Sequence, residues 1–134
     1  MYDHPFQWGS RRIGPDLHRI GVRNPSAVWH LRHFNNPQDT SVGTMMPSYQ
    51  HLLAKDLDFE VIPRNMTALK SIGVPYTEEE ILGAVVAAKS QASVVAQELA
   101  NGGQNGYESK KVVALIAYLQ RLGTDITNDT AEAK

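Results

Sequence analysis

A chain of 134 residues, 42% of them hydrophobic, is long enough to fold as one domain with a core of its own. Its formal net charge of −1 does not indicate a protein that binds nucleic acid, since such proteins usually carry an excess of basic residues. The lack of cysteine excludes disulfides, zinc–thiolate sites and thiol nucleophiles. No stretch approaches the roughly 20 consecutive apolar residues of a membrane-spanning helix.

The first 23 residues contain too many helix breakers to form a regular helix. Apolar residues between the breakers can anchor the segment against the rest of the protein, and long loops in compact domains usually have a function. We therefore expect residues 1–23 to be an irregular, functional segment. The breakers are Pro5, Gly9, Gly14, Pro15 and Gly21.

The dipeptide Asn24-Pro25 is typical of a helix start, because asparagine caps the first turn and proline lacks an N–H that the first turn cannot use. The helix is expected to run through Phe34. His30 and His33 lie three residues apart on this helix and could reach one metal ion. No third ligand stands at a suitable spacing, so we interpret the pair as a coincidence of the helical surface.

A short loop, residues 44–49, has the sequence Thr-Met-Met-Pro-Ser-Tyr. Pro47 fixes its own φ angle and holds Met46 in an extended conformation, so the Met46 thioether is presented from a stiff backbone. Thioethers are soft ligands for low-valent copper and for haem iron. Most methionines instead fill gaps in a core, and this alternative stays open for Met45 and Met46.

Two more helices are predicted in the middle of the chain. Residues 38–62 show no regular periodicity, and Pro63 then opens a helix over residues 64–72. A capping box follows, in which Glu80 completes the start of a helix over Thr77–Leu99, and the acidic first turn complements the helix dipole. The cluster of glutamates is therefore explained by helix electrostatics rather than by catalysis.

The last predicted helix, residues 109–122, carries one apolar stripe and is stopped by Gly123. We expect residues 125–134 to form a polar tail after a single domain over residues 1–124. The fold class is all-α with long loops. The chain has no glycine-rich phosphate loop, no G-x-S-x-G and no H-E-x-x-H motif, so it is not expected to be an enzyme on its own.

Several of these segments together resemble one known family, the mono-haem cytochrome c subunit of cbb3-type cytochrome c oxidase (FixO/CcoO). The resemblance covers nearly the whole chain up to Thr124 and implies a cytochrome c-like helical domain that relays single electrons between haems. The matching segments are residues 2–12 (YDHPFQWGSRR), 14–17 (GPDL), 29–30 (WH), 36–37 (NP), 46–47 (MP), 73–77 (GVPYT) and 117–123 (AYLQRLG).

The resemblance implies a role for individual residues at a c-type haem. Met46 matches the distal axial ligand of the haem iron. Pro15 matches the proline whose carbonyl group accepts a hydrogen bond from the proximal histidine, and Leu17 matches the leucine that packs on the haem face. Trp29 is expected in the pocket wall or at a subunit interface, and Tyr49, which closes the methionine loop, is counted with the cofactor-binding residues.

The chain departs from the family pattern, in which a membrane anchor and a C-x-x-C-H motif precede the segment that matches Tyr2. We therefore expect a C-terminal part of such a subunit, incomplete at its N-terminus and unable to attach haem covalently. Two alternatives stay open. One is a haem-free helical docking module, and the other is non-covalent haem binding through one of the histidines His4, His18, His30 and His33.

The resemblance also implies partners and a compartment. The partners are other subunits of a membrane-bound terminal oxidase, on the periplasmic side of the bacterial cytoplasmic membrane, and the chain as given is expected to be soluble. Without a preceding helix, the stripe on residues 109–122 would be uncovered, at about 1.5 to 3 kcal/mol per exposed side chain. We expect it to be covered by the helix over Thr77–Leu99 or by a second copy of the protein.

Overall fold

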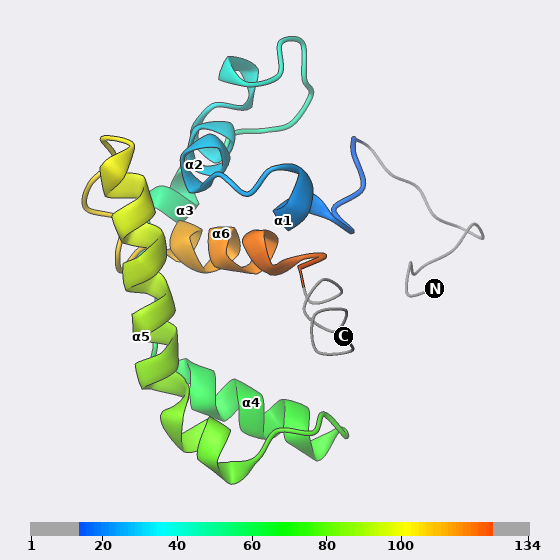
Figure 1. The fold of residues 1–134 in the computed structure, drawn as a ribbon, viewed down its shortest axis with the longest axis vertical. Coiled ribbons are helices and arrows are strands. Elements are labelled where there is room, and N and C mark those ends of the chain that lie inside the picture. The colour runs from blue at the N-terminus through cyan, green and yellow to red at the C-terminus, as the bar shows by residue number, and fades with distance from the viewer. Residues whose placement is uncertain (1–13, 125–134) are drawn as a thin grey trace, which may run out of the picture. The chain divides into compact units, whose positions relative to one another are not determined.

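The computed structural model describes residues 14–124, and every regular element in that range is helical (Figure 1). The all-α prediction is confirmed. The elements in chain order are α1 (Ile20–Arg23), α2 (Ala27–Asn35), the short 3₁₀ helix η1 (Pro37–Asp39), α3 (Gln50–Ala54), α4 (Val61–Ser71), α5 (Glu78–Asn101) and α6 (Lys111–Arg121).

The protein forms two compact units, one of residues 27–117 and one that combines residues 1–26 with 118–134. The core of the larger unit is built by α2, α5 and the first two turns of α6. Each fully buried aliphatic or aromatic residue there contributes about 1.5 to 3 kcal/mol. The buried apolar residues of this unit are Ala27, Leu31, Phe34, Ile81, Ala84, Ala92, Val95, Leu99, Val112, Val113 and Ile116.

Helix α2 begins at Ala27 rather than directly after Asn24, so the predicted cap was wrong. The Asn24 N–H ends α1 by donating to the Ile20 carbonyl oxygen at 2.8 Å. The Ala27 N–H, one of the donors that has no partner within its own helix, donates instead to Glu98 Oε1 of α5 at 2.7 Å. A carboxylate from α5 therefore takes the capping role that the local sequence assigned to Asn24.

Short helices interrupt segments that were predicted to be irregular, namely α1 within residues 1–23 and η1 and α3 within residues 38–62. They are too short to show a helical period in the sequence. Helix α4 also begins two residues before Pro63. Proline is accepted there because the N–H groups of the first turn have no partner inside the helix.

Helix α5 starts as predicted. Thr77 Oγ1 accepts from the Glu80 N–H at 3.2 Å, and Glu80 Oε2 accepts from the Thr77 N–H at 2.8 Å. The Thr77 N–H and the Thr77 hydroxyl both donate to Glu80 Oε2, which stabilises the carboxylate and holds the pKa of Glu80 below its ordinary value. Although α5 has 24 residues, neither it nor another helix between residues 14 and 124 is long and apolar enough to cross a membrane.

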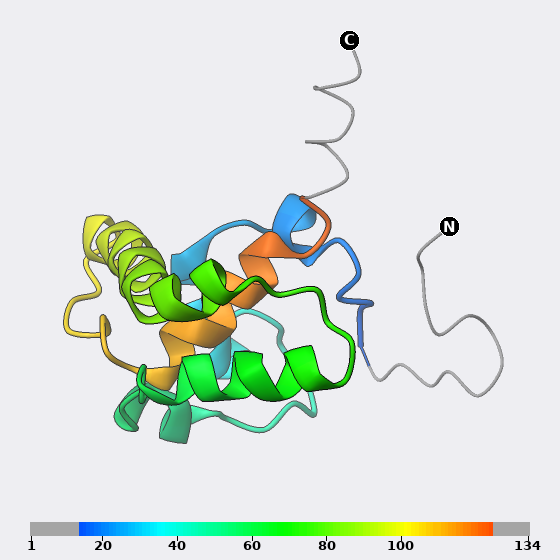
Figure 2. The same ribbon diagram turned by 90° about the horizontal axis from the view of Figure 1, so that it is seen from below.

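Helix α4 packs against α5 within the larger unit (Figure 2). The connection between the two helices is short, residues 72–77, so α5 turns back directly after α4 ends. Lys70, near the end of α4, forms an ion pair with Glu78 in the first turn of α5. The pair is exposed and adds little stability.

The apolar stripe of α6 is covered within one molecule. Val112 and Ile116 are completely buried in the larger unit, and Leu119, in the smaller unit, is also buried. A second copy of the protein was expected only as a cover for this stripe. Since a single molecule buries it, that reason for a dimer disappears.

In the smaller unit, α1 packs directly on the last turn of α6. The Gly21 N–H donates to the Leu122 carbonyl oxygen at 3.0 Å, and Gln120 Nε2 donates to the Pro25 carbonyl oxygen at 2.6 Å. A Cβ atom at Gly21 would lie 2.1 Å from the Gln120 carbonyl oxygen. Only glycine therefore permits this approach of the two backbones.

We predict that Thr77→Ala lowers the free energy of unfolding by about 1 kcal/mol, because it removes the side-chain acceptor of the capping box. Urea denaturation followed by circular dichroism measures the change. Thr67→Ala is the matched control, since the Thr67 hydroxyl donates to the Pro63 carbonyl oxygen of its own helix and caps no helix start. An equal loss in both variants would contradict the capping role.

We predict that Gly21→Ala lowers the free energy of unfolding by about 1 to 3 kcal/mol, because the new methyl group must displace backbone rather than a flexible side chain. Gly83→Ala is the control. Gly83 lies within α5, and a Cβ atom added there would meet only open space, so alanine should stabilise by roughly 0.5 to 1 kcal/mol. Thermal denaturation of both variants tests the pair, and a neutral effect at Gly21 would show that the two backbones do not meet.

Candidate functional site

The methionine loop, residues 44–49, follows α2 and η1 and leads into α3 (Figure 1). Its last residues are tied to the C-terminal end of α2. The Tyr49 N–H donates to the Phe34 carbonyl oxygen at 2.8 Å, and Ser48 Oγ donates to the Asn35 carbonyl oxygen at 2.6 Å. Both acceptors belong to the last turn of α2, where carbonyl groups have no partner within the helix. The loop therefore supplies hydrogen-bond donors to the last carbonyl groups of α2, and the same hydrogen bonds fix the position of the loop.

The first part of the loop is braced by the Gln38 side chain. Gln38 Nε2 donates to the Thr44 carbonyl oxygen at 2.8 Å, and Gln38 Oε1 accepts from the Gly43 N–H at 3.0 Å. Thr44 Oγ1 in turn accepts from the Met46 N–H at 3.2 Å. With Pro47 restricting the next φ angle, the backbone of Met46 is held on both sides.

The two methionines lie in different environments. Met45 is 86% exposed, so it does not fill a core gap as the alternative interpretation required. Met46 is half-buried. Of the two, only Met46 combines a hydrogen-bonded backbone, a following proline and partial burial.

The aromatic and imidazole rings of α2 contact one another, and the last of them contacts Tyr49 of the methionine loop. Trp29 stacks on His33 with ring centroids 4.7 Å apart, and His30 lies 6.3 Å from Phe34. Phe34 then meets Tyr49 edge to face at 6.2 Å. The structure thus brings Trp29, Tyr49 and the methionine loop together in one unit.

The two histidines of α2 differ in burial. His30 is buried to 2% exposure, and no buried side-chain nitrogen or oxygen in residues 14–124 lacks a hydrogen-bond partner. His33 is half-buried, and its Nδ1 is hydrogen-bonded to Thr40 Oγ1. Burial holds the pKa of His33 below its ordinary value of 6.5. Residues 14–124 contain no group of three His, Cys, Asp or Glu side chains arranged to hold a metal ion.

Pro15 and Leu17 belong to the smaller unit, in the bend that precedes α1. Leu17 is 52% exposed, and its carbonyl oxygen accepts from the Ile20 N–H at 3.0 Å. Asp16 orders this bend, because its Oδ1 accepts from the His18 N–H at 3.0 Å and its carbonyl oxygen accepts from the Arg23 guanidinium. His4 and the segment 2–12 lie outside the described residues, as does the tail 125–134.

Sequence reasoning missed the residues that hold the loop in place. Gln38 and Ser48 were not singled out, although polar side chains on both sides of a proline-containing turn commonly bond to nearby backbone. The burial of His30 gave no local signal at all. It depends on which residues of distant helices cover α2.

The segment after α3 is joined to the start of α6. The Leu57 N–H donates to the Ser109 carbonyl oxygen at 2.7 Å, and the Lys111 N–H donates to the Lys55 carbonyl oxygen at 3.0 Å. Between them, Lys110 Nζ lies 2.8 Å from Asp56 Oδ1, and the hydrogen bond from this lysine holds the pKa of Asp56 below its ordinary value. The Asp56 carboxylate is exposed and the ion pair adds little stability, so the backbone hydrogen bonds make the connection.

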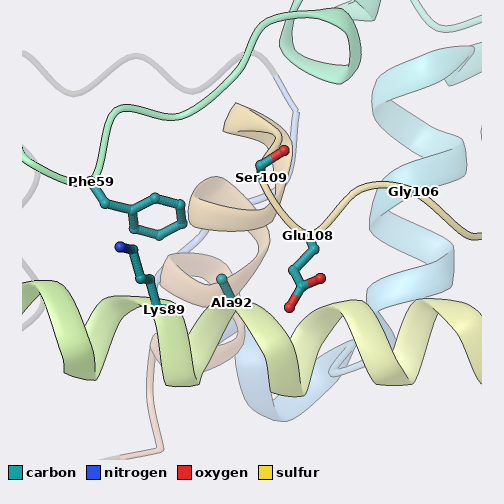
Figure 3. Close-up of a pocket in the computed structure, with 6 residues that line it drawn as sticks. All are labelled: Phe59, Lys89, Ala92, Gly106, Glu108 and Ser109. Carbon is teal, nitrogen blue, oxygen red and sulfur yellow. The ribbon is translucent and has the colours of Figure 1, made fainter.

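An open cavity of about 450 Å³ lies elsewhere in the larger unit (Figure 3). Lys89 Nζ sits 5.9 Å from the centre of the Phe59 ring, and Glu108 extends from the connector before α6. None of the residues predicted for the cofactor lines this cavity. Its lining is Phe59, Lys89, Ala92, Gly106, Glu108 and Ser109.

The methionine loop thus presents one half-buried thioether from a backbone that is anchored at both ends. The family model described as the mono-haem subunit of cytochrome c oxidase, FixO, matches residues 1–126. The protein belongs to the FixO family, and so to the subunits of an oxidoreductase complex with other oxidase subunits as partners. A comparison with curated proteins gives no match.

The residues of this protein fit one side of a haem site. The donor chemistry of Met46 suits an axial position on haem iron, and its backbone is fixed. The 134 residues contain no cysteine, so they provide no thioether bond to a haem. Covalent attachment through these residues is therefore excluded, and the histidine opposite Met46 is not identified by any contact within residues 14–124.

We predict that the protein loses stability when the pH falls below 6.5, because the folded state binds a proton at His33 less readily than the unfolded state does. The contribution of His33 is present above the unfolded pKa and is lost as the pH falls through the lower folded pKa. Because a single proton is involved, the slope stays below about 1.4 kcal/mol per pH unit, and solvent screening of this half-buried group keeps the total contribution small.

The measurement is the free energy of unfolding between neutral and mildly acidic pH for the original protein and for His33→Gln, which should show a flatter profile. His51→Gln, at an exposed position on α3, is the control and should leave the profile unchanged. Identical profiles for all three proteins would contradict the role of His33.

Proposed function

We propose that this protein provides the methionine side of the haem site in a cytochrome c oxidase mono-haem subunit, with Met46 as the distal axial ligand. The observation that carries the proposal is the contrast between the two methionines. Met46 is half-buried on a backbone held through Thr44, whereas Met45 is 86% exposed. The family membership over residues 1–126 supports a haem-dependent role.

The protein's own residues would position the ligand and shield it. Hydrogen bonds from Ser48 and Tyr49 to the end of α2 keep the loop from retreating, so the thioether need not be ordered when it binds iron. The rings of Trp29 and Tyr49 offer apolar walls that limit the access of water. When bound, the haem supplies a one-electron carrier whose reduction potential is raised by a methionine ligand.

Pro15 and Leu17, in the smaller unit, have proposed roles of their own. The Pro15 carbonyl group is proposed to accept a hydrogen bond from the proximal histidine, which would fix the ring orientation. Leu17 has the exposed apolar surface needed to pack on a haem face. On this proposal the subunit relays electrons on the periplasmic side of the membrane and makes or breaks no bonds of its own.

We predict that the 134-residue protein, mixed with ferric haem and one equivalent of imidazole per haem as the opposite ligand, gives a low-spin spectrum with the far-red band of methionine–iron coordination. Met46→Ala should lose that band because the thioether is removed. Met45→Ala is the matched control and should keep it, since the Met45 side chain is mostly exposed to solvent. Visible absorption and the haem-bound methionine methyl signals in NMR measure the outcome.

Two results would contradict the proposal. One is the absence of the methionine band in the original protein with imidazole present, provided that circular dichroism shows the helical fold. The other is a band that survives Met46→Ala but disappears in Met45→Ala. Because imidazole supplies the opposite ligand, neither result depends on which histidine the intact subunit uses.

A further inference from the structure

Two identical dipeptides, Asn101-Gly102 and Asn105-Gly106, stand four residues apart at the end of α5. An asparagine followed by glycine can close a five-membered ring, because glycine has no side chain to hinder its nitrogen from reaching the asparagine amide carbon. The reaction requires a backbone that can rotate and a glycine N–H that is free to lose its proton. The two dipeptides differ in both respects.

The first dipeptide is held by the helix. Asn101 is the last residue of α5, and the Gly102 N–H donates to the carbonyl oxygens of Leu99 at 3.0 Å and Glu98 at 3.3 Å. Gly102 also packs against Val28, because a Cβ atom there would lie 2.3 Å from Val28 Cγ2. Its nitrogen is therefore engaged and its backbone is confined.

The second dipeptide is held by none of these contacts. Asn105 and Gly106 are both exposed, and Gly106 has a φ angle of +85° in the connector between α5 and α6. The Gly106 N–H donates a hydrogen bond to no residue between 14 and 124. Both residues line an open cavity of about 280 Å³, and Gly106 also borders the larger cavity of Figure 3. Water and the rotating amide both have room there.

We propose that Asn105 is a site of spontaneous modification through a succinimide. The Gly106 nitrogen attacks the Asn105 amide carbon, and a new C–N bond forms while the bond from that carbon to the amide nitrogen breaks. The amide nitrogen leaves as ammonia, which takes up the proton from the Gly106 nitrogen. One water molecule then opens the ring at either carbonyl carbon and gives aspartate or isoaspartate.

The modification changes charge and backbone length at a defined place. The formal net charge goes from −1 to −2, and the new carboxylate lies in the same cavity lining as Glu108. In isoaspartate the backbone runs through the former side-chain carbon atoms and gains one atom. That atom is inserted a few residues before Ser109 and Lys111, whose backbone hydrogen bonds join α6 to residues 55–57.

The test is incubation of the folded 134-residue protein in mildly alkaline buffer, followed by peptide mapping with mass spectrometry that separates aspartate from isoaspartate. Asn105 should be converted roughly tenfold faster or more than Asn101, because the Asn101 site reacts only after local opening of the helix end. In denaturant the two sites should react at similar rates. The comparison is internal, since both dipeptides are in one molecule.

Asn105→Gln, which would have to close a less favourable six-membered ring, should abolish the fast conversion and leave the slow one at Asn101 unchanged. Circular dichroism of the incubated samples verifies that the helical fold persists. Equal rates at Asn101 and Asn105 in the folded protein, or no conversion at Asn105 while denaturant activates it, would overturn the proposal. The outcome is independent of the haem titration, because neither dipeptide contacts the methionine loop through any hydrogen bond or ring contact found in residues 14–124.

Discussion

The candidate site depends on the carbonyl groups at the end of α2. A helix leaves its last carbonyls without partners, and here Phe34 and Asn35 receive donors from Tyr49 and Ser48. The constraint acts in both directions, because the helix end is satisfied only when the loop returns to it. Met46 lies two residues before Ser48 and three before Tyr49, so its position is fixed by the same hydrogen bonds that complete the helix.

Helix α2 can serve as this anchor because it is itself fixed in the core. Ala27 and Leu31 are buried within the larger unit, and the start of the helix is capped by Glu98 from α5. The helix also carries the rings of Trp29, His33 and Phe34, of which Phe34 meets Tyr49 of the loop. One helix therefore provides core packing, a wall of rings and the attachment point of the methionine loop. This is the arrangement that we propose as one side of a haem site, in a protein of the FixO family.

The sequence predicted the features that depend on near neighbours. The capping box of Thr77 and Glu80 lies within one helical turn, so its geometry is determined locally. The restriction of Met46 by Pro47 is also local, and it identified the loop before any contact was known. The starts of α2 and α4 were not predicted to the residue. Proline is accepted at several positions in the first turn of a helix, and the cap of a helix can come from another helix.

What the sequence determined by itself is therefore the helical class, the long helix α5 and the one stiff methionine loop, because each depends on residues a few positions apart. Tertiary structure alone decided the contacts between distant residues. The Glu98 carboxylate caps a helix that begins 71 residues earlier, and the stripe of α6 is covered within one molecule. It also distinguishes Asn101 from Asn105, two identical local sequences, because only one of the following glycine nitrogens is engaged by a helix end.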